Sequence, residues 1–258
     1  MTATDADIGL ALADIVEEAG RLILPYWSHG GTVAHTSKAD MSPVTIADQE
    51  GEKLIVRRLK ARFPDIAIVA EEHASEFGTP DAIGDRFFLV DPVDGTKAFM
   101  RGDPSFTVNI GLVAGRRPVA GAVCAPATGE TWFTTAMGAM KRAEGGAASA
   151  VHVRPWPKGE AVALISHTMK EETLAKLTAE YGFDLKVAMD SSVKLCRIAE
   201  GAADIYPRHG PTSEWDICAA QAVLEAAGGS VTGYQGAEFL YGKADKRFLN
   251  EWFVAWGG

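Results

Sequence analysis

Acidic side chains follow two short apolar segments, at positions where each segment is expected to end as a β-strand. Asp91 and Asp94 stand in LVDPVDGTKAFM (residues 89–100), and Glu71 stands in AIVAEE (residues 67–72). A charged side chain at the end of a buried strand costs free energy unless it has a partner. If the two strands are neighbours in one sheet, their acidic ends meet at the same edge. A set of carboxylates without histidine or cysteine suits Mg²⁺ or Mn²⁺ rather than Zn²⁺.

The residues that follow Asp91 favour the same kind of site. The carbonyl of Val93 is expected to point toward the same edge and to add one more oxygen ligand. Gly95 and Thr96 come next, where the turn is expected to open a helix, and free backbone N–H groups at the positive end of a helix bind phosphate. The Thr96 hydroxyl is also placed to orient a water molecule. The alternative is that DPVDG (residues 91–95) is an ordinary turn, since Asp, Pro and Gly are all common in turns.

A further acidic residue, Asp216, stands in GPTSEWD (residues 210–216). Gly210 and Pro211 indicate a turn, so Asp216 falls in the first turn of a helix expected over residues 214–227. The alternative is an acidic residue that only complements the helix dipole, which is a common arrangement. Together with the acids at the strand ends, Asp216 favours a single cluster of oxygen ligands.

Two helices are expected before the first acidic strand. Apolar residues recur at helical spacing and predict a helix over residues 5–27. The polar stretch over residues 28–43 is expected to form a loop or a short hairpin. Thr45 is expected to cap a second helix, with Asp48 at the capping-box position, and Pro64 is expected to end this helix.

The pattern then changes to that of strands. FTVNIGLVAG, RPVAGAVCAP and GETWFTTA are typical of three neighbouring antiparallel strands. The small residues over 144–150 indicate a boundary, beyond which strands alternate with helices expected over residues 170–181, 192–200 and 214–227. We therefore expect an α+β half over residues 1–150 with most of the candidate metal ligands, followed by an α/β half over residues 151–258 that carries Asp216 and substrate contacts.

Composition excludes several classes of function. The chain has 258 residues, a net charge of −9 and three widely spaced cysteines. An acidic balance argues against binding to nucleic acid or to an anionic membrane, because both require a cationic surface. The cysteine spacing indicates neither a zinc site nor a disulfide framework, and buried thiols are expected instead. With no signal-peptide pattern and no long apolar run, the sequence predicts a soluble cytoplasmic protein without a membrane span.

The motifs resemble those of the magnesium-dependent, lithium-sensitive phosphatase superfamily that includes inositol monophosphatase. The matching segments are SPVTIAD (residues 42–48), VAEE, DPVDGT and EWD ahead of an alanine-rich helix, and the resemblance spans about residues 38–220. Within that superfamily the chain is most similar to the CysQ-type 3′(2′),5′-bisphosphate nucleotidases, on the segments DGTKAF, FTVNIGLV, SSVKLCRIAEGAADIYPR and GPTSEWD. The resemblance implies the layered αβαβα sandwich of this superfamily, with mixed α+β and α/β character.

The resemblance also implies roles for individual residues. Asp48, Thr96 and Glu71 are the catalytic residues, and Asp48 and Thr96 form the pair that activates water. The implied ligands of two or three Mg²⁺ ions, which Mn²⁺ can replace, are Glu71, Asp91, Asp94, Asp216 and the Val93 carbonyl. The amides of Gly95 and Thr96 hold the phosphate, and the remaining implied substrate contacts are Ser191, Ser192, Lys194, Glu214 and Asp216.

The implied reaction is hydrolysis of a small phosphorylated substrate. The first candidate is removal of the 3′-phosphate from 3′-phosphoadenosine 5′-phosphate (PAP), giving AMP, or from its sulfated precursor (PAPS), giving APS. Inositol monophosphate, histidinol phosphate and fructose 1,6-bisphosphate are alternative substrates in the same superfamily, whose CysQ-type members are often monomers. A metal-binding regulator without catalysis is the alternative outside enzymes, but it has no need of Asp48 and Thr96.

Overall fold

The first of two large β-sheets has seven strands within the described residues, and they cross the sheet in the order in which they occur in the chain. The computed structural model describes residues 5–30 and 43–258, and most of the loop or hairpin expected over residues 28–43 lies outside them. Strands β1 and β2 are parallel, and the other pairs are antiparallel. The strands are β1 (Ala67–Ala70), β2 (Arg86–Asp94), β3 (Thr107–Ala114), β4 (Arg117–Ala125), β5 (Glu130–Thr135), β6 (Gly138–Ala143) and β7 (Ser149–Ala150).

The second large sheet has the strand order β12-β14-β10-β8-β9. Its strands β8, β9 and β10 are parallel, and β14 runs antiparallel to both β10 and β12. A small third sheet pairs β11 with β13. These strands are β8 (Val162–Ile165), β9 (Leu185–Ala188), β10 (Ile205–Arg208), β11 (Thr212–Ser213), β12 (Ser230–Gly233), β13 (Leu249–Asn250) and β14 (Phe253–Trp256).

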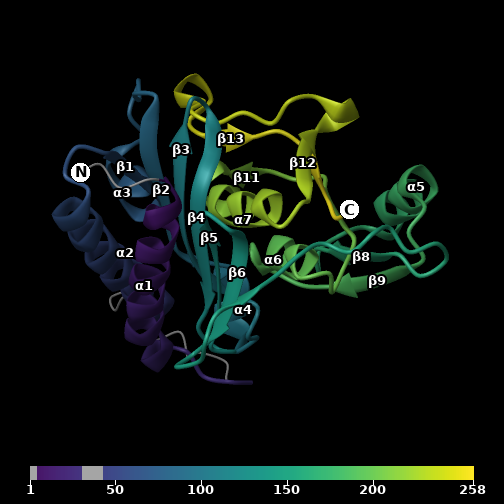
Figure 1. Cartoon of the computed structure of the whole chain (residues 1–258), viewed down its shortest axis with the longest axis horizontal. Helices are drawn as coiled ribbons and strands as arrows, with labels where there is room; N and C mark the ends of the chain where they lie inside the picture. Colours follow the sequence, from purple (N-terminus) through teal and green to yellow (C-terminus); the bar gives the residue numbers. More distant parts are fainter. Residues whose placement is uncertain (1–4, 31–42) are drawn as a thin grey trace.

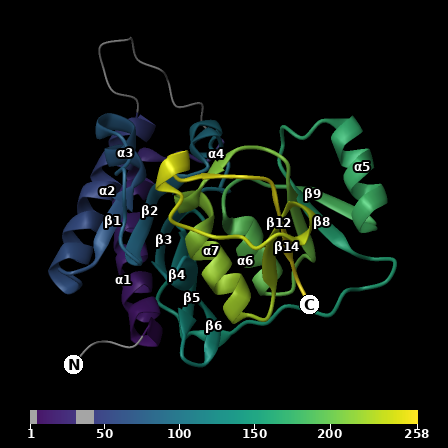
Figure 2. The same ribbon diagram turned by 90° about the horizontal axis from the view of Figure 1, so that it is seen from above.

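Helices cover both sheets and fill the space between them (Figures 1 and 2). Helices α1 and α2 pack on one face of the first sheet, α6 and α7 lie between the two sheets, and α5 covers the outer face of the second sheet. This arrangement confirms the expected αβαβα sandwich. The helices are α1 (Asp5–Ile23), α2 (Pro43–Arg62), α3 (Glu71–Phe77), α4 (Thr96–Arg101), α5 (Glu171–Tyr181), α6 (Val193–Ala199) and α7 (Glu214–Ala226), with 3₁₀ turns at Leu24–Tyr26, Tyr234–Gly236 and Ala244–Lys246.

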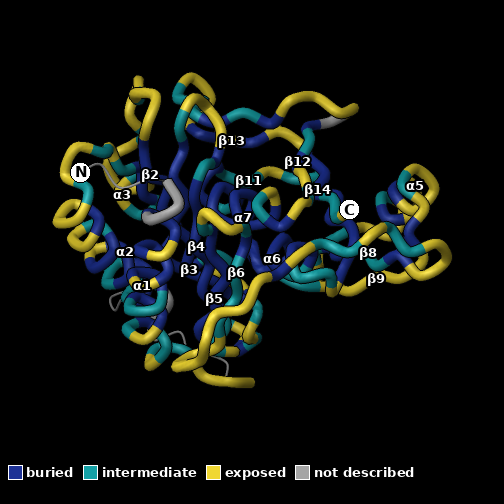
Figure 3. Tube along the Cα trace, in the orientation of Figure 1, coloured by how far each residue is buried: buried dark blue, intermediate teal, exposed yellow. Residues whose placement is uncertain are grey.

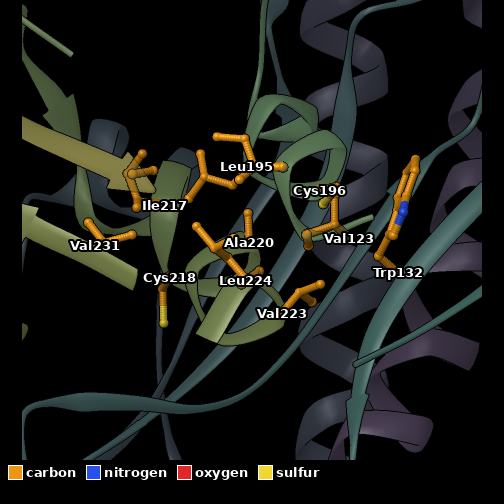
Figure 4. Packing of buried hydrophobic residues seen from close by; sticks show 14 of the residues in the cluster. Val123, Trp132, Leu195, Cys196, Ile217, Cys218, Ala220, Val223, Leu224 and Val231 are labelled. Carbon is orange, nitrogen blue, oxygen red and sulfur yellow. The ribbon is translucent and has the colours of Figure 1, made fainter. Parts of the chain in front are cut away.

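Helix α7 is the centre of the core that joins the two sheets. Its apolar residues pack with those of α6, with Val123 and Trp132 of the first sheet and with Val231 of the second (Figure 4). The helix approaches the first sheet closely, because a Cβ atom added at Gly121 would lie 2.4 Å from the carbonyl oxygen of Ala219. The middle strands of the first sheet are buried along most of their length, while exposed residues gather in the loops and on α5 (Figure 3).

The first two helices differ from their expected limits. Helix α1 ends at Ile23 rather than at residue 27, and the chain continues as a 3₁₀ turn. Pro25 explains this end, because proline lacks an N–H and its ring clashes with the carbonyl of the preceding turn. The N-cap prediction for Thr45 was wrong, since α2 already begins at Pro43 and places Asp48 in its second turn. Proline at the first helical position is favourable because its missing N–H is not needed there.

Six further elements were predicted to within a few residues, whereas α3 and the short strands β6, β7, β9, β11 and β13 were not predicted. The three antiparallel strands are β3, β4 and β5, and the helices expected over 170–181, 192–200 and 214–227 are α5, α6 and α7. The three cysteines are buried free thiols, as expected. In the part of the chain that the structure describes, no helix is both long and apolar enough to cross a membrane.

A network of charged side chains fastens α6 to the first sheet. Arg197 of α6 lies 2.6 Å from Glu130 of β5, and Lys141 of β6 lies 2.6 Å from Glu130 and 2.8 Å from Glu200. Arg197 and Lys141 also lie 5.0 Å from the Trp132 ring, where cations are attracted to the aromatic face. The first turn of α6 contributes to the candidate active site described below, so the network also supports that site.

Replacement of Glu130 by glutamine is expected to lower the free energy of unfolding by about 2 kcal/mol near neutral pH, because charged hydrogen bonds are lost. Burial alone would raise the pKa of Glu130, but hydrogen bonds from Arg197, Lys141 and Thr128 hold it at about 2, below its usual 4.5. The stabilisation is therefore present above pH 4.5 and is lost as the pH falls toward 2. Urea unfolding across this range, with Glu144→Gln as a surface control, should show the difference shrinking at low pH; a difference independent of pH would contradict this account.

Candidate active site

The two acidic strand ends meet at one edge of the first sheet. Strands β1 and β2 are parallel neighbours, with Ala70 opposite Val90. Glu71 follows β1 directly, and Asp91 follows Val90, so both carboxylates emerge at the same edge, as predicted. Their side chains are close enough for a hydrogen bond in which protonated Asp91 donates to Glu71.

The DPVD segment departs from regular strand geometry. The register of β2 against β3 shifts between Asp91 and Asp94. Within this irregular stretch the Val93 N–H donates to Asp91 Oδ1 at 3.0 Å, and the Val93 carbonyl accepts a hydrogen bond from Thr96 Oγ1 at 3.3 Å. The irregularity places Asp91, Val93 and Asp94 near one another instead of on alternating faces of a strand.

Four carboxylates influence one another at this edge. Burial raises the pKa of Glu71 to about 7 and the pKa of Asp91, Asp94 and Asp216 above the usual range. Repulsion among them adds to the effect, since the charges of Glu71, Asp94 and Asp216 all raise the pKa of Asp91. Such a cluster of acids retains protons at neutral pH unless cations neutralise it.

The donor set fits a hard divalent cation. It consists of carboxylate and carbonyl oxygens, which are the ligands preferred by Mg²⁺. As the side chains stand, no three His, Cys, Asp or Glu side chains within residues 5–30 and 43–258 are arranged to hold an ion. The carboxylates are turned to hydrogen-bond partners in the protein: Asp91 to Glu71 and Val93, Asp94 to Ser192, and Asp216 to Ser213. Cation binding therefore requires these side chains to turn from their present hydrogen-bond partners.

Helix α4 begins beside the carboxylates, as predicted for DPVDGT. Gly95 precedes it with φ of +89°, a left-handed conformation that favours glycine. A Cβ atom at this position would lie 2.9 Å from the carbonyl oxygen of Ser105 and 3.2 Å from the Cβ of Ser191. Glycine is therefore required both by the backbone conformation and by the close approach of the loop before α6.

A polar cluster that the sequence analysis did not identify supports Asp94. Its Oδ2 atom accepts the Ser192 N–H at 2.5 Å and the Asn109 side-chain amide at 3.4 Å. The Ser192 hydroxyl donates to Asn109 Oδ1 at 2.9 Å and lies 2.9 Å from the Thr107 hydroxyl. Thr107 and Asn109 are both fully buried in β3. Two polar residues on the same face of an otherwise apolar strand were the signal that could have revealed them.

The loop before α6 is held in an unusual conformation. Ser191 has φ of +53°, which is rare for a residue other than glycine. The ammonium group of Lys194 donates to the Ser191 carbonyl at 2.6 Å and to the Met189 carbonyl at 3.2 Å, and it lies 4.8 Å from the Tyr206 ring. Burial lowers the pKa of Lys194 to about 8, although nearby Asp94 opposes this effect. Lys194 thus brings a buried cation close to the carboxylates.

Asp216 and Glu214 have different environments, although both were expected to contact the substrate. Asp216 stands in the first turn of α7 and accepts the Ser213 N–H at 2.9 Å. Glu214 is fully buried and accepts the N–H groups of Gly242 and Lys243 at 2.8 and 3.0 Å. Its carboxylate also lies 3.0 Å from the Lys243 ammonium. The structure places Glu214 in a link between α7 and the C-terminal segment, away from the residues that line the pocket, and we do not retain it as a substrate contact.

Asp48 lies behind Glu71. It is buried in α2, and burial together with the charges of Glu72 and Glu71 raises its pKa to about 8. Among the described residues no hydrogen bond joins Asp48 to Thr96, whose hydroxyl is directed at the Val93 carbonyl. A rotation of the exposed Thr96 side chain is needed before the two residues can act as a pair.

Glu52, one helical turn after Asp48, positions the start of α3 and was not identified from the sequence. Its buried carboxylate accepts the N–H groups of Glu72 and His73 at 2.7 and 2.9 Å. These N–H groups belong to the first turn of α3 and therefore have no partner within the helix. The positive end of the helix dipole at this turn also favours a carboxylate. Glu71 is the first residue of that helix, so Glu52 supports the backbone segment that carries Glu71.

The substitution Glu52→Ala is expected to raise the Mg²⁺ concentration needed for half-maximal activity about tenfold, since supporting residues of metal sites have effects of this size. Calorimetric titration with Mg²⁺ provides the direct measurement. Glu50→Ala is a matched control, because Glu50 is a partly exposed residue of the same helix whose carboxylate contacts Lys53. Unchanged Mg²⁺ affinity in Glu52→Ala would exclude this role.

Two of the four carboxylates, Asp94 and Asp216, line a pocket of about 320 Å³ between the two halves of the chain, whereas Glu71 and Asp91 do not line it. Several expected residues line it: Asp94, Gly95, Thr96, Ser191, Ser192, Lys194 and Asp216. Lys97, Arg101, His167, Tyr206 and Arg208 also line the pocket and were not identified as site residues from the sequence. Arg101 lies 2.5 Å from Asp190, which also contacts His167 at 3.3 Å, so α4 and the loops after β8 and β9 are linked across the pocket mouth.

Comparison with known proteins identifies the family. The profile of the inositol monophosphatase family matches residues 7–252 of the chain. The protein belongs to the inositol monophosphatase family. Among curated relatives, the 3′(2′),5′-bisphosphate nucleotidase CysQ of Salmonella typhimurium is 34% identical over 242 residues, which cover 94% of this chain and 96% of the relative. An inositol monophosphatase of Mesembryanthemum crystallinum is 27% identical and covers 91% of this chain and 88% of the relative.

Solved structures have the same fold. CysQ from Bacteroides thetaiotaomicron, a bacterial member of the inositol monophosphatase family, superposes with a TM-score of 0.81 and 30% identity over 98% of this chain and 97% of its own. An inositol monophosphatase from Zymomonas mobilis superposes with a TM-score of 0.79 and 23% identity over 100% of this chain and 94% of its own. The members of this family are metal-dependent phosphatases, generally with Mg²⁺.

Proposed function

We propose that this protein is a magnesium-dependent 3′(2′),5′-bisphosphate nucleotidase that converts PAP to AMP and PAPS to APS. One observation carries the proposal: Asp94 and Asp216 of the carboxylate cluster line a pocket that also contains the cations Lys194 and Arg208. A substrate with two anionic groups needs positive charge beyond the metal site. The similarity to CysQ nucleotidases over nearly the whole chain supports the same choice.

Glu71, Asp91, Asp94, Asp216 and the Val93 carbonyl are the proposed ligands of two or three Mg²⁺ ions. Bound Mg²⁺ supplies a more acidic water molecule and neutralises charge on the phosphoryl group and the leaving oxygen. The ligands contribute by standing close together before the substrate arrives. The polar cluster of Ser192, Asn109 and Thr107 supports Asp94 through hydrogen bonds to its Oδ2 atom.

Asp48 and Thr96 direct the attacking water. The Thr96 hydroxyl turns from the Val93 carbonyl toward the Asp48 carboxylate, donates its proton there and accepts a hydrogen bond from the water. Asp48 suits this role, because burial and its acidic neighbours raise its pKa to about 8 and a general base works best with a pKa near the ambient pH. The proton of the water thus has a defined path through Thr96 Oγ1.

The backbone N–H groups of Gly95 and Thr96 orient the phosphoryl group, because they are unsatisfied donors at the start of α4. Lys194 and Arg208, which also line the pocket, attract the rest of the anionic substrate. Phosphate ester hydrolysis depends mainly on such positioning and charge neutralisation.

We further propose that the chain is a monomer and that Mn²⁺ can replace Mg²⁺. Light scattering tests the first of these proposals, and phosphate release measured with each cation tests the second.

Phosphate release from PAP, inositol 1-phosphate, histidinol phosphate and fructose 1,6-bisphosphate, measured at one Mg²⁺ concentration, tests the assignment. We expect kcat/KM for PAP to exceed the others by about tenfold or more, a difference of about 1.4 kcal/mol in transition-state binding. A higher kcat/KM for another ester would make that ester the substrate of the same metal site. No hydrolysis of any of them would support a regulator that binds metal without catalysis.

A further inference from the structure

The active-site pocket contains a carboxylate that the proposed metal site does not use. Among the described residues that line the pocket, Asp190 is the one acidic residue outside the proposed set of ligands. It stands in the loop between β9 and α6. A negative charge at this position opposes the binding of a phosphate ester, so its presence in the pocket needs an explanation.

Asp190 is ionised at neutral pH and fixed in position. Burial alone would raise its pKa, but hydrogen bonds from Arg101 and His167 lower the pKa below its usual 3.8. Lys194 holds the backbone on either side of Asp190, because its ammonium group donates to the carbonyls of the preceding and the following residue at 3.2 and 2.6 Å. The carboxylate therefore keeps both its charge and its place.

The nearest charged partner of Asp190 is Arg101, the last residue of α4. The Arg101 guanidinium group donates to Asp190 Oδ2 at 2.5 Å, and the Nδ1 atom of His167 lies 3.3 Å from Asp190 Oδ1. Arg101 also lines the pocket, and Asp103 lies 3.8 Å from its guanidinium group. In this arrangement two carboxylates neutralise the charge of Arg101, so that this charge does not attract a ligand.

The ion pair between Arg101 and Asp190 is open to exchange. The Arg101 side chain is 48% exposed, compared with 23% for Arg197 in the network that joins α6 to the first sheet. Ion pairs at exposed positions contribute little free energy. Arg101 contacts Asp190 through Nη2, whereas a phosphate group can accept two parallel hydrogen bonds from a guanidinium group. The long arginine side chain can thus turn from the fixed carboxylate to a ligand in the same pocket.

We propose that Asp190 is a built-in competitor of the phosphorylated ligand for Arg101 and thereby limits the affinity of the pocket for such ligands. A phosphorylated ligand binds Arg101 only after the guanidinium group has left Asp190, and the ion pair forms again when the product leaves. The proposal rests on the proposed phosphatase function and adds a control of product release, a step that limits turnover in many enzymes.

Asp190→Asn tests this competition through the binding of inorganic phosphate, measured by calorimetry in Mg²⁺. The amide does not neutralise Arg101, so we expect phosphate to bind about fivefold more tightly, at the upper end of what an exposed ion pair contributes. The inhibition constant of AMP as a product should fall by about the same factor. In an Arg101→Gln background, the same replacement should change phosphate affinity less than about twofold, since no guanidinium group remains to be released.

Asp103→Asn is the matched control, because Asp103 contacts the same guanidinium group but does not line the pocket. Its phosphate affinity is expected to stay within about twofold of the wild type. Asp190→Ser is a second variant with the same expected gain as Asp190→Asn. Unchanged phosphate affinity in both Asp190 variants would overturn the competition. An equal gain with and without Arg101 would also overturn it, because removal of a negative charge would then explain the whole effect.

These outcomes are distinct from those of the substrate comparison. If an ester other than PAP is preferred, or if none is hydrolysed, the nucleotidase proposal fails, while phosphate affinity still decides the competition. A wild-type protein that binds no phosphate would overturn the competition as well. Because the expected result is tighter binding, partial unfolding of a variant cannot produce it.

Discussion

Replacement of Asp94 by asparagine is expected to lower kcat by about a thousandfold or more, because a proposed metal ligand and its charge are both removed. Asp94 is one of the four carboxylates at the edge of the first sheet, and it also lines the pocket. The amide retains an oxygen that can accept the Ser192 N–H, so the buried polar cluster remains satisfied. The loss should therefore affect catalysis and leave folding intact.

Circular dichroism and thermal unfolding of Asp94→Asn establish whether the fold is retained. Asp103→Asn is a suitable control, because Asp103 accepts the Ser105 N–H outside the pocket, and its kcat is expected to stay within about twofold of the wild type. Near wild-type kcat in Asp94→Asn at saturating Mg²⁺ would remove Asp94 from the catalytic site and, with it, the proposed arrangement of ligands.

Removal of divalent cations with a chelator is expected to lower phosphate release by about a thousandfold or more, and added Mg²⁺ should restore it. Ionised carboxylates repel a phosphate ester, and burial together with the charges of Glu71, Asp94 and Asp216 raises the pKa of Asp91, so the cluster needs cations before it can bind the substrate. Millimolar lithium is expected to inhibit by competing with one Mg²⁺ ion, which a titration at several Mg²⁺ concentrations measures.

Retained secondary structure after chelation is the necessary control, since unfolding would also abolish activity. Inhibition by lithium should weaken as Mg²⁺ increases if the two ions compete for one site. Activity that survives complete chelation would contradict the role of the carboxylates as metal ligands. Activity unchanged by lithium would contradict competition between Li⁺ and Mg²⁺ for one site.

The sequence by itself determined the local structure of the site and predicted its oxygen-rich donor set. Asp91 and Asp94 stand at the end of an apolar run, and Gly95 and Thr96 open α4, as their residue types predict. These features depend on contacts between residues close in the chain, so composition and spacing are sufficient to reveal them. The helix limits at Ile23 and Pro43 were missed because two prolines changed the local geometry.

The tertiary structure decided which distant side chains support the site and which do not. Thr107 and Asn109 of β3 contact Ser192, more than eighty residues away in the chain, and Asp190 contacts Arg101 of α4. Glu214 is two residues from Asp216, yet its carboxylate binds the C-terminal segment instead of facing the pocket. No local pattern encodes such neighbours, because they depend on how α6 and α7 pack between the two sheets. The sequence pattern of a short polar residue in a strand is the same whether its hydrogen-bond partner is water or a buried carboxylate. The packing of the elements determines which of these partners it has.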